Sequence, residues 1–277
     1  MKRAYLTFDD GPSSYTDRLV DFLCSKNVPA IFFVHGENMM KEHYFPSIVR
    51  AIKKGIVIGN HSLNHNRASE IGFEEQIRQI IEAQKLIDRA YHEAGRDHAP
   101  RYFRFPHLDR GCGNAHVIDM ATVEEQYRDY VRDLFWEGVR IETKEPPTAG
   151  QIELKNSLQK WFIQNGFKKL PTPGVIFPWW VNSELSEAVD SLVTFSTSDW
   201  MMGPRHAGKG QLKTTDALKN KIDTDPWLNR EDSAHIILMH DDRDPANEQR
   251  EDLLTITENL VNHMLNSNFT FLEFKET

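Results

Sequence analysis

The chain has 277 residues, 39% of them hydrophobic, which supports one large or two small globular domains and excludes a fibrous or disordered protein. Its net charge of −8 and pI near 5.8 provide no basic surface for nucleic acid, so no nucleic-acid partner is expected. The two cysteines form no disulfide framework, and no apolar run is long enough to predict a membrane span. Because no signal peptide precedes the first strand-like run, the sequence predicts a cytoplasmic protein.

Strand-like and helical patterns alternate through the first hundred residues. Apolar runs predict buried strands, and amphipathic spacing with proline before and glycine after predicts helices. In order, these patterns predict a strand over 5–8, a helix over 17–23, a strand over 30–34, a helix over 46–55, a strand over 56–59, a helix over 73–94 and a strand over 102–106. Repeated strand–helix units indicate a parallel sheet, either open or closed into a barrel.

The regular pattern loosens between about residues 109 and 178. Two capping-box patterns, Thr122-x-x-Glu125 and Thr148-x-x-Gln151, predict helices there. This mainly helical insertion either packs as a neutral appendage or forms a wall or lid over a site. Cys112, in a glycine-rich loop of this region, is expected to be an exposed thiol, whereas Cys24 is expected in the core. Strands over 193–195, 235–239 and 268–272 then complete a single domain spanning residues 1–277.

Two carboxylates and two histidines follow separate predicted strands. Asp9 and Asp10 come at the end of the first strand, and Gly11-Pro12 supplies the turn that lets both side chains reach one site. His61 and His65 follow the strand over 56–59. Each motif alone is more often a solvated turn or a surface helix, but the carboxyl ends of parallel strands meet at one edge. A carboxylate with two imidazoles at that edge predicts a divalent-metal site.

Three further strand ends carry polar side chains, namely Arg104, Asp199 with Trp200, and His240. His35 also follows a strand directly, a position from which it could reach the site, but a lone histidine there is more often a satisfied structural residue. The segment Phe177-Pro178-Trp179-Trp180 is strand-like too, and Trp179 or Trp180 is an alternative to Trp200 for lining a pocket.

The ordered motifs resemble those of the polysaccharide deacetylases, also called the NodB-homology domain or carbohydrate esterase family four. The resemblance covers residues 4 to 274, interrupted by the insertion, and implies an irregular (β/α)7-type barrel. The motifs that carry it are Thr7-Phe8-Asp9-Asp10-Gly11-Pro12, His61-Ser62-x-x-His65, Arg104-x-Pro106, Asp199-Trp200 and Leu238-x-His240.

The resemblance also implies a role for each motif residue. Asp10, His61 and His65 would hold one divalent metal, most commonly Zn, with Co, Ni or Mn as alternatives, and Asp9 would be the general base that deprotonates a metal-bound water. Arg104 would orient Asp9, and the backbone N–H of His107 would stabilise the oxyanion. His240 would protonate the departing amine, with Asp199 hydrogen-bonded to its other ring nitrogen. Trp200 and Leu238 would shape a pocket for the acetyl group. The family's aromatic and glycine after Pro106 are replaced by His107-Leu108 here, which alters the floor of the sugar groove, and Ser196 stands where the family often has an acid.

The implied function is metal-dependent hydrolysis of N-acetyl groups on an amino sugar, oligosaccharide or sugar conjugate. Two alternatives remain open at this level. A cytoplasmic enzyme with the same site would hydrolyse a small non-sugar amide, ureide or formyl group. The other alternative is a non-catalytic binding protein on the same fold. It is disfavoured because such a protein has no chemical need for the metal ligands, the base, the arginine and the acid together.

Overall fold

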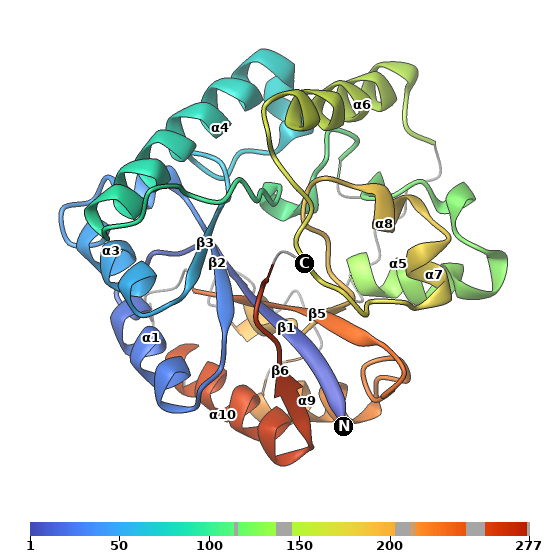
Figure 1. The fold of residues 1–277 in the computed structure, drawn as a ribbon. Helices are drawn as coiled ribbons and strands as arrows, with labels where there is room; N and C mark the ends of the chain where they lie inside the picture. Colours follow the sequence, from blue (N-terminus) through green and yellow to red (C-terminus); the bar gives the residue numbers. More distant parts are fainter. Residues whose placement is uncertain (114–115, 137–145, 203–211, 213, 242–252, 276–277) are drawn as a thin grey trace.

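The computed structural model describes residues 1–113, 116–136, 146–202, 212, 214–241 and 253–275. Among the described residues, no helix combines the length and the apolar character needed to cross a membrane. The elements alternate between strands and helices around a central parallel sheet (Figure 1). The sheet consists of β1 (Lys2–Asp9), β2 (Ala30–Val34), β3 (Val57–Asn60), β4 (Phe195–Ser196), β5 (Ala234–His240) and β6 (Phe269–Phe271).

Strand β1 lies at the centre of this sheet, and the strand order is β3-β2-β1-β5-β4. Along one edge β1 pairs with β5 over its whole length, from Arg3 opposite Ala234 to Asp9 opposite His240. Along the other edge its first residues pair with β6 and its last with β2. All of these pairings are parallel, so the carboxyl ends of β1, β2, β3 and β5 lie at the same end of the molecule.

Single hydrogen bonds continue the sheet into an irregular barrel. Asn60 at the end of β3 bonds Tyr102 O through its N–H and Arg104 N through its carbonyl, and Ser191 N donates to Phe103 O at 2.7 Å. The Thr194 N–H then donates to Ile236 O at 2.9 Å, which returns the ring to β5. The irregular parallel barrel expected from the sequence is therefore confirmed.

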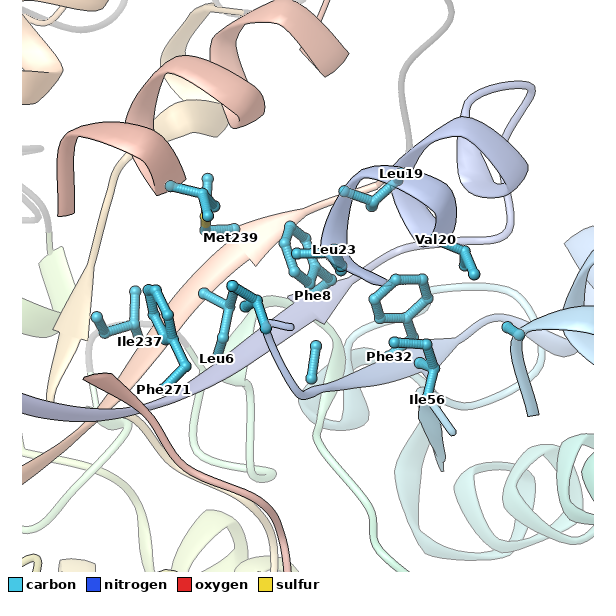
Figure 2. Packing of buried hydrophobic residues seen from close by; sticks show 14 of the residues in the cluster. Leu6, Phe8, Leu19, Val20, Leu23, Phe32, Ile56, Ile237, Met239 and Phe271 are labelled. Carbon is cyan, nitrogen blue, oxygen red and sulfur yellow. The ribbon is translucent and has the colours of Figure 1, made fainter. Parts of the chain in front are cut away.

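Successive side chains along each strand point alternately out of the barrel, toward the helices, and into its interior. Leu6, Phe8, Phe32, Ile237 and Met239 face outward and pack against helices, as Figure 2 shows for Leu19, Val20 and Leu23 of α1 (Thr16–Ser25). The alternate residues Tyr5, Thr7 and Asp9 face the barrel interior, as do their partners on β5.

The helices outside these strands are α1, α3 (Phe45–Lys53), α4 (Ala68–Glu93), α9 (Thr215–Thr224) and α10 (Leu253–Asn266), with the short α2 (Gly36–Met39) after β2. Helix α4 begins five residues earlier than predicted, with a break at Gly72, whose φ of 76° only glycine adopts readily.

The insertion region is helical but extends further than expected, as Figure 1 shows on the side opposite α1 and α3. It contains α5 (Arg128–Trp136), α6 (Ala149–Gln164), α7 (Pro178–Val181) and α8 (Glu184–Glu187). The capping box at Thr148 is confirmed, with both reciprocal hydrogen bonds present. The one expected at Thr122 is wrong, because its hydroxyl donates to Asp119 O within a short 3-10 turn.

Three other expectations are corrected. Residues 102–106 form a single bridge at Phe103 rather than a strand, since Pro106 starts a 3-10 turn. The segment at Phe177 is a helical turn, because Pro178 occupies its first position. Cys112 is 2% exposed, and its thiol lies against Gln151 O.

Candidate metal and active site

The register of the sheet brings the predicted residues to one end of the barrel. Asp9 pairs with His240 on β5 and with Phe33 on β2, so Asp9 and His240 are lateral neighbours on the same face. Val34 pairs with Asn60, which places the next residues of the two chains, His35 and His61, beside each other.

Four side chains form a cluster here, in which Asp10, His35, His61 and His65 each offer one ligand atom within 4.8 Å of the others. The Oδ1 atom of Asp10 is at the centre, 3.0 Å from His65 Nε2, 3.2 Å from His61 Nε2 and 3.4 Å from His35 Nε2. Asp10 Oδ1 is buried and makes no hydrogen bond within the described part of the chain. Such an orphaned carboxylate oxygen is costly unless a cation satisfies it.

Asp10 reaches this position because its own backbone turns. Its φ is 76°, so the turn that separates Asp10 from the strand face begins at Asp10 itself, before Gly11-Pro12. Ser62 and His65 also have positive φ, at 69° and 59°. Non-glycine residues held in this region cost about 1–3 kcal/mol each and concentrate at functional sites.

The tautomer of His61 is fixed by a backbone partner. His61 Nδ1 lies 2.9 Å from Arg104 O, a pure acceptor, so Nδ1 carries the proton and donates it. Nε2 is the ring atom that faces Asp10, and a backbone acceptor on the other ring nitrogen is typical of metal-ligating histidines. The ring is 1% exposed.

The electrostatics of the cluster favour an ionised Asp10 beside a neutral His35. Burial alone would raise the pKa of Asp10, but His65, His35 and His61 hold that pKa well below its usual range. Burial lowers the pKa of His35 to about 4, despite the opposing effect of Asp10, so His35 is neutral at pH 7. A carboxylate and neutral imidazoles are the protonation states that metal binding requires.

Asp9 lies beside the cluster and is held by a buried arginine. Arg104 Nη1 donates to Asp9 Oδ1 at 2.7 Å and to Thr7 Oγ1 at 2.8 Å. Arg104 is fully buried, its Nε donates to Ser191 O at 2.9 Å, and its guanidinium stacks over the Phe33 ring. Asp9 Oδ2 is 3.9 Å from His61 Nε2, so its second oxygen faces the cluster.

On the other side of Asp9, His240 forms a buried ion pair with Asp199. His240 Nδ1 lies 2.7 Å from Asp199 Oδ1, and Asp199 Oδ2 accepts the backbone N–H of His240 at 2.8 Å. Burial alone would lower the pKa of His240, but Asp199 overrides it and raises that pKa to about 10. The imidazolium with Nε2–H is therefore the form present at neutral pH.

The remaining predicted residues surround these groups. Pro106 is buried, and the His107 ring packs 4.2 Å from the His65 ring, from a backbone with φ 57°. Leu238 is 6% exposed on the inner face of β5, and Trp200 is partly exposed in a 3-10 turn after Asp199.

Trp179 belongs to a separate aromatic core. Its ring stacks on Phe177 at 5.3 Å and meets Tyr130 and Trp227, and it is 1% exposed. His35 lies in the cluster, so of the two roles that its position directly after a strand left open, contact with the site is the one the structure favours. Its Nε2 makes no hydrogen bond within the described residues.

The fold and the site define an α/β barrel with a candidate divalent-metal centre, a candidate base and a candidate acid at the carboxyl ends of its strands. Residues 1–142, just over half of the chain, match the family model described as polysaccharide deacetylase. The chain belongs to the polysaccharide deacetylase family.

Curated relatives carry related names. A peptidoglycan-N-acetylglucosamine deacetylase of Bacillus cereus is 40% identical over 104 residues, covering 37% of this chain and 35% of that protein. A chitin deacetylase of Colletotrichum lindemuthianum is 32% identical over 138 residues (45% and 52%), and a chitooligosaccharide deacetylase of Rhizobium leguminosarum is 35% identical over 122 residues (43% and 52%). The chain thus spans about a third to a half of these relatives' length.

Solved structures support the fold over the whole chain. A polysaccharide deacetylase from Bacillus cereus aligns with a TM-score of 0.55 at 21% identity, covering 100% of this chain and 93% of that one. The chitin deacetylase from Colletotrichum lindemuthianum aligns with a TM-score of 0.57 at 19% identity, covering 98% and 84%.

Proposed function

We propose that this protein is a metal-dependent deacetylase that hydrolyses the N-acetyl group of an amino sugar, oligosaccharide or sugar conjugate. The observation that carries the proposal is one arrangement: Asp9, held by Arg104, lies between the Asp10 cluster and the His240–Asp199 ion pair. Base, candidate metal ligands and acid thus converge at one end of the barrel, as amide hydrolysis requires.

Asp10, His61 and His65 would hold the metal ion. The donor set fits, because the unpartnered Asp10 Oδ1 lies 3.2 Å from His61 Nε2 and 3.0 Å from His65 Nε2. Two donors on one zinc ion at bond lengths near 2.1 Å are about 3.0–3.4 Å apart. When bound, such an ion activates a water and polarises the substrate carbonyl. Zn, Co, Ni and Mn all accept this mixed nitrogen and oxygen set.

Asp9 acts as the general base. Arg104 occupies its Oδ1 and keeps the carboxylate in one orientation, which leaves Oδ2 directed toward the cluster to accept a proton. Arg104 does not touch the reacting atoms and is a positioning residue.

His240 acts as the general acid. Its Nδ1–H bond to Asp199 fixes the ring and leaves the Nε2 proton for the departing nitrogen. Protonating that nitrogen as the C–N bond breaks gives a free amine and acetate. Leu238 and Trp200 would enclose the acetyl methyl group. The backbone N–H of His107, the residue after Pro106, would donate to the oxyanion.

The substrate panel tests the proposal against its closest rival. Metal-loaded protein is incubated with chito-oligosaccharides, peptidoglycan fragments, small N-acyl amides, ureides and formamides, and released acetate, formate and amine are measured. Acetate from the sugars is the expected result. Release of product only from the small amides, ureides or formamides would show that the substrate is not a sugar. Absence of any release, together with absence of bound metal, would refute both enzyme functions. The cellular location stays a prediction.

Two variants test the roles. Asp9→Asn is expected to lower turnover by about 10²–10⁴-fold while retaining metal, whereas His61→Ala loses the metal. Asp97→Asn, at an exposed carboxylate, is the matched control. Full activity of Asp9→Asn would show that the base is elsewhere.

A further inference from the structure

His35 is anchored by the backbone between the two loops that carry the other cluster members. Its N–H donates to Gly11 O at 2.8 Å, next to Asp10. On its other side, Gly36 N donates to Ser62 O at 3.0 Å, within the His61–His65 loop. His35 therefore bridges the two loops and is positioned by both.

The neighbouring glycine makes this position tight. A Cβ atom at Gly36 would come within 2.8 Å of a Leu63 methyl and 3.2 Å of the Ala83 Cα on α4. The Glu37 N–H adds a bond of 2.7 Å to Leu63 O. The backbone after β2 is thus pressed against the histidine loop, which holds the His35 ring in the cluster.

The His35 side chain is arranged like those of the two predicted histidine ligands. Its ring lies 5.3 Å from the His61 ring and 4.6 Å from the His65 ring, and its Nε2 is 3.4 Å from Asp10 Oδ1. That separation lies within the range of about 3.0–3.4 Å expected for two donors on one zinc ion. Within the described residues, Nε2 is buried and makes no hydrogen bond, so a structural role leaves this atom unsatisfied.

We propose that His35 Nε2 is a fourth protein ligand, which makes the metal site an aspartate with three histidines. This inference rests on the proposed metal site, to which it adds one donor. A nitrogen-rich set binds Zn, Co and Ni more tightly than Mn, whose preference is for oxygen ligands. His35 should therefore increase both metal retention and the preference for these ions over Mn.

The test measures metal binding, independently of catalysis. Metal-free wild type, His35→Ala, His35→Gln, His65→Ala and His43→Ala are titrated with Zn²⁺, Co²⁺ and Mn²⁺ against a competing chelator, and the absorption spectrum of each Co²⁺ form is recorded. His43 is an exposed histidine outside the cluster and serves as the matched control. His35→Gln keeps the volume and an amide that can hydrogen-bond Asp10, and circular dichroism verifies that each variant is folded.

We expect His35→Ala to weaken Zn²⁺ and Co²⁺ binding at least ~10-fold, because loss of a residue that merely hydrogen-bonds a ligand already costs that much. The loss for Mn²⁺ should be smaller, and the Co²⁺ spectrum should change. His35→Gln should not restore binding, and His43→Ala should match wild type. Restoration by glutamine, a loss below tenfold, or an unchanged Co²⁺ spectrum overturns the inference. If wild type binds no metal, or His65→Ala binds as wild type does, the proposed site itself is wrong. If His65→Ala loses metal but His35→Ala binds it as wild type does, the fourth ligand is refuted and the proposed function is kept.

Discussion

Replacing Asp199 by asparagine should lower the pKa of His240 and destabilise the protein over a defined pH range. Asp199, with smaller contributions from Asp10 and Asp9, raises that pKa from 6.5 to about 10, so the ion pair accounts for at most about 5 kcal/mol. Removing one partner of a buried pair commonly costs about 3–5 kcal/mol. Part of this cost is geometric, because the amide nitrogen of asparagine would face the His240 backbone N–H that Asp199 Oδ2 now accepts.

The sign of the pH dependence follows from the raised pKa. His240 is charged in the folded protein and loses its proton near pH 6.5 when unfolded, so the pair stabilises fully below pH 6.5. That contribution falls as pH rises toward about 10. The difference in unfolding free energy between wild type and Asp199→Asn should therefore be largest near pH 6 and shrink toward pH 10.

The assay combines two measurements on metal-free protein. Urea unfolding at pH 6, 8 and 10 gives the difference in free energy, and NMR follows the His240 ring proton through the same range. A His240 pKa near 6.5 in wild type, unchanged by Asp199→Asn, would refute the ion-pair reasoning. So would a stability difference that does not vary with pH.

Other predictions test the positioning of the site and the fold around it. Arg104→Lys, which cannot reproduce the bonds to Ser191 O, Thr7 and Asp9 together, should destabilise by about 3–5 kcal/mol in urea unfolding, and wild-type stability would show that the buried guanidinium is dispensable. Thr148→Ala removes the capping box of α6 and should cost about 1 kcal/mol, whereas Thr122→Ala, which caps no helix, should cost less; equal losses would contradict this assignment. Zn²⁺ at 100 times its Kd should stabilise the protein by about 2.7 kcal/mol and raise its melting temperature, and a metal-independent Tm would contradict a folded-state site.

The sequence predicts which side chains lie together where a local pattern and a strand end coincide. Asp10, His61 and His65 lie together because the carboxyl ends of parallel strands meet at one edge of the sheet. The hydrophobic runs in the sequence are sufficient to predict where those strands end. The role of His35 stayed open because a lone histidine has no periodicity. Its relation to His61 depends on the β2–β3 register, which places Val34 opposite Asn60 and is a property of the folded sheet.

The insertion region is poorly predicted for a related reason. The places of its helices depend on contacts between residues far apart in the sequence, such as Arg110 Nε with Asp190 Oδ2 at 3.0 Å and Lys155 Nζ with Glu184 Oε2 at 2.8 Å. No local pattern encodes such pairs. The Trp179 segment shows the same limit, because a short apolar run fits a strand or a buried helical turn equally until its packing is known.

Metal reconstitution tests the central claim most directly. Protein stripped of metal is titrated with Zn²⁺ or Co²⁺, and acetate release from a chito-oligosaccharide is measured at each addition. The account predicts no release without metal and a linear rise that stops at one equivalent per chain. Acetate release that persists in the stripped protein, or that is unaffected by added metal, would contradict it.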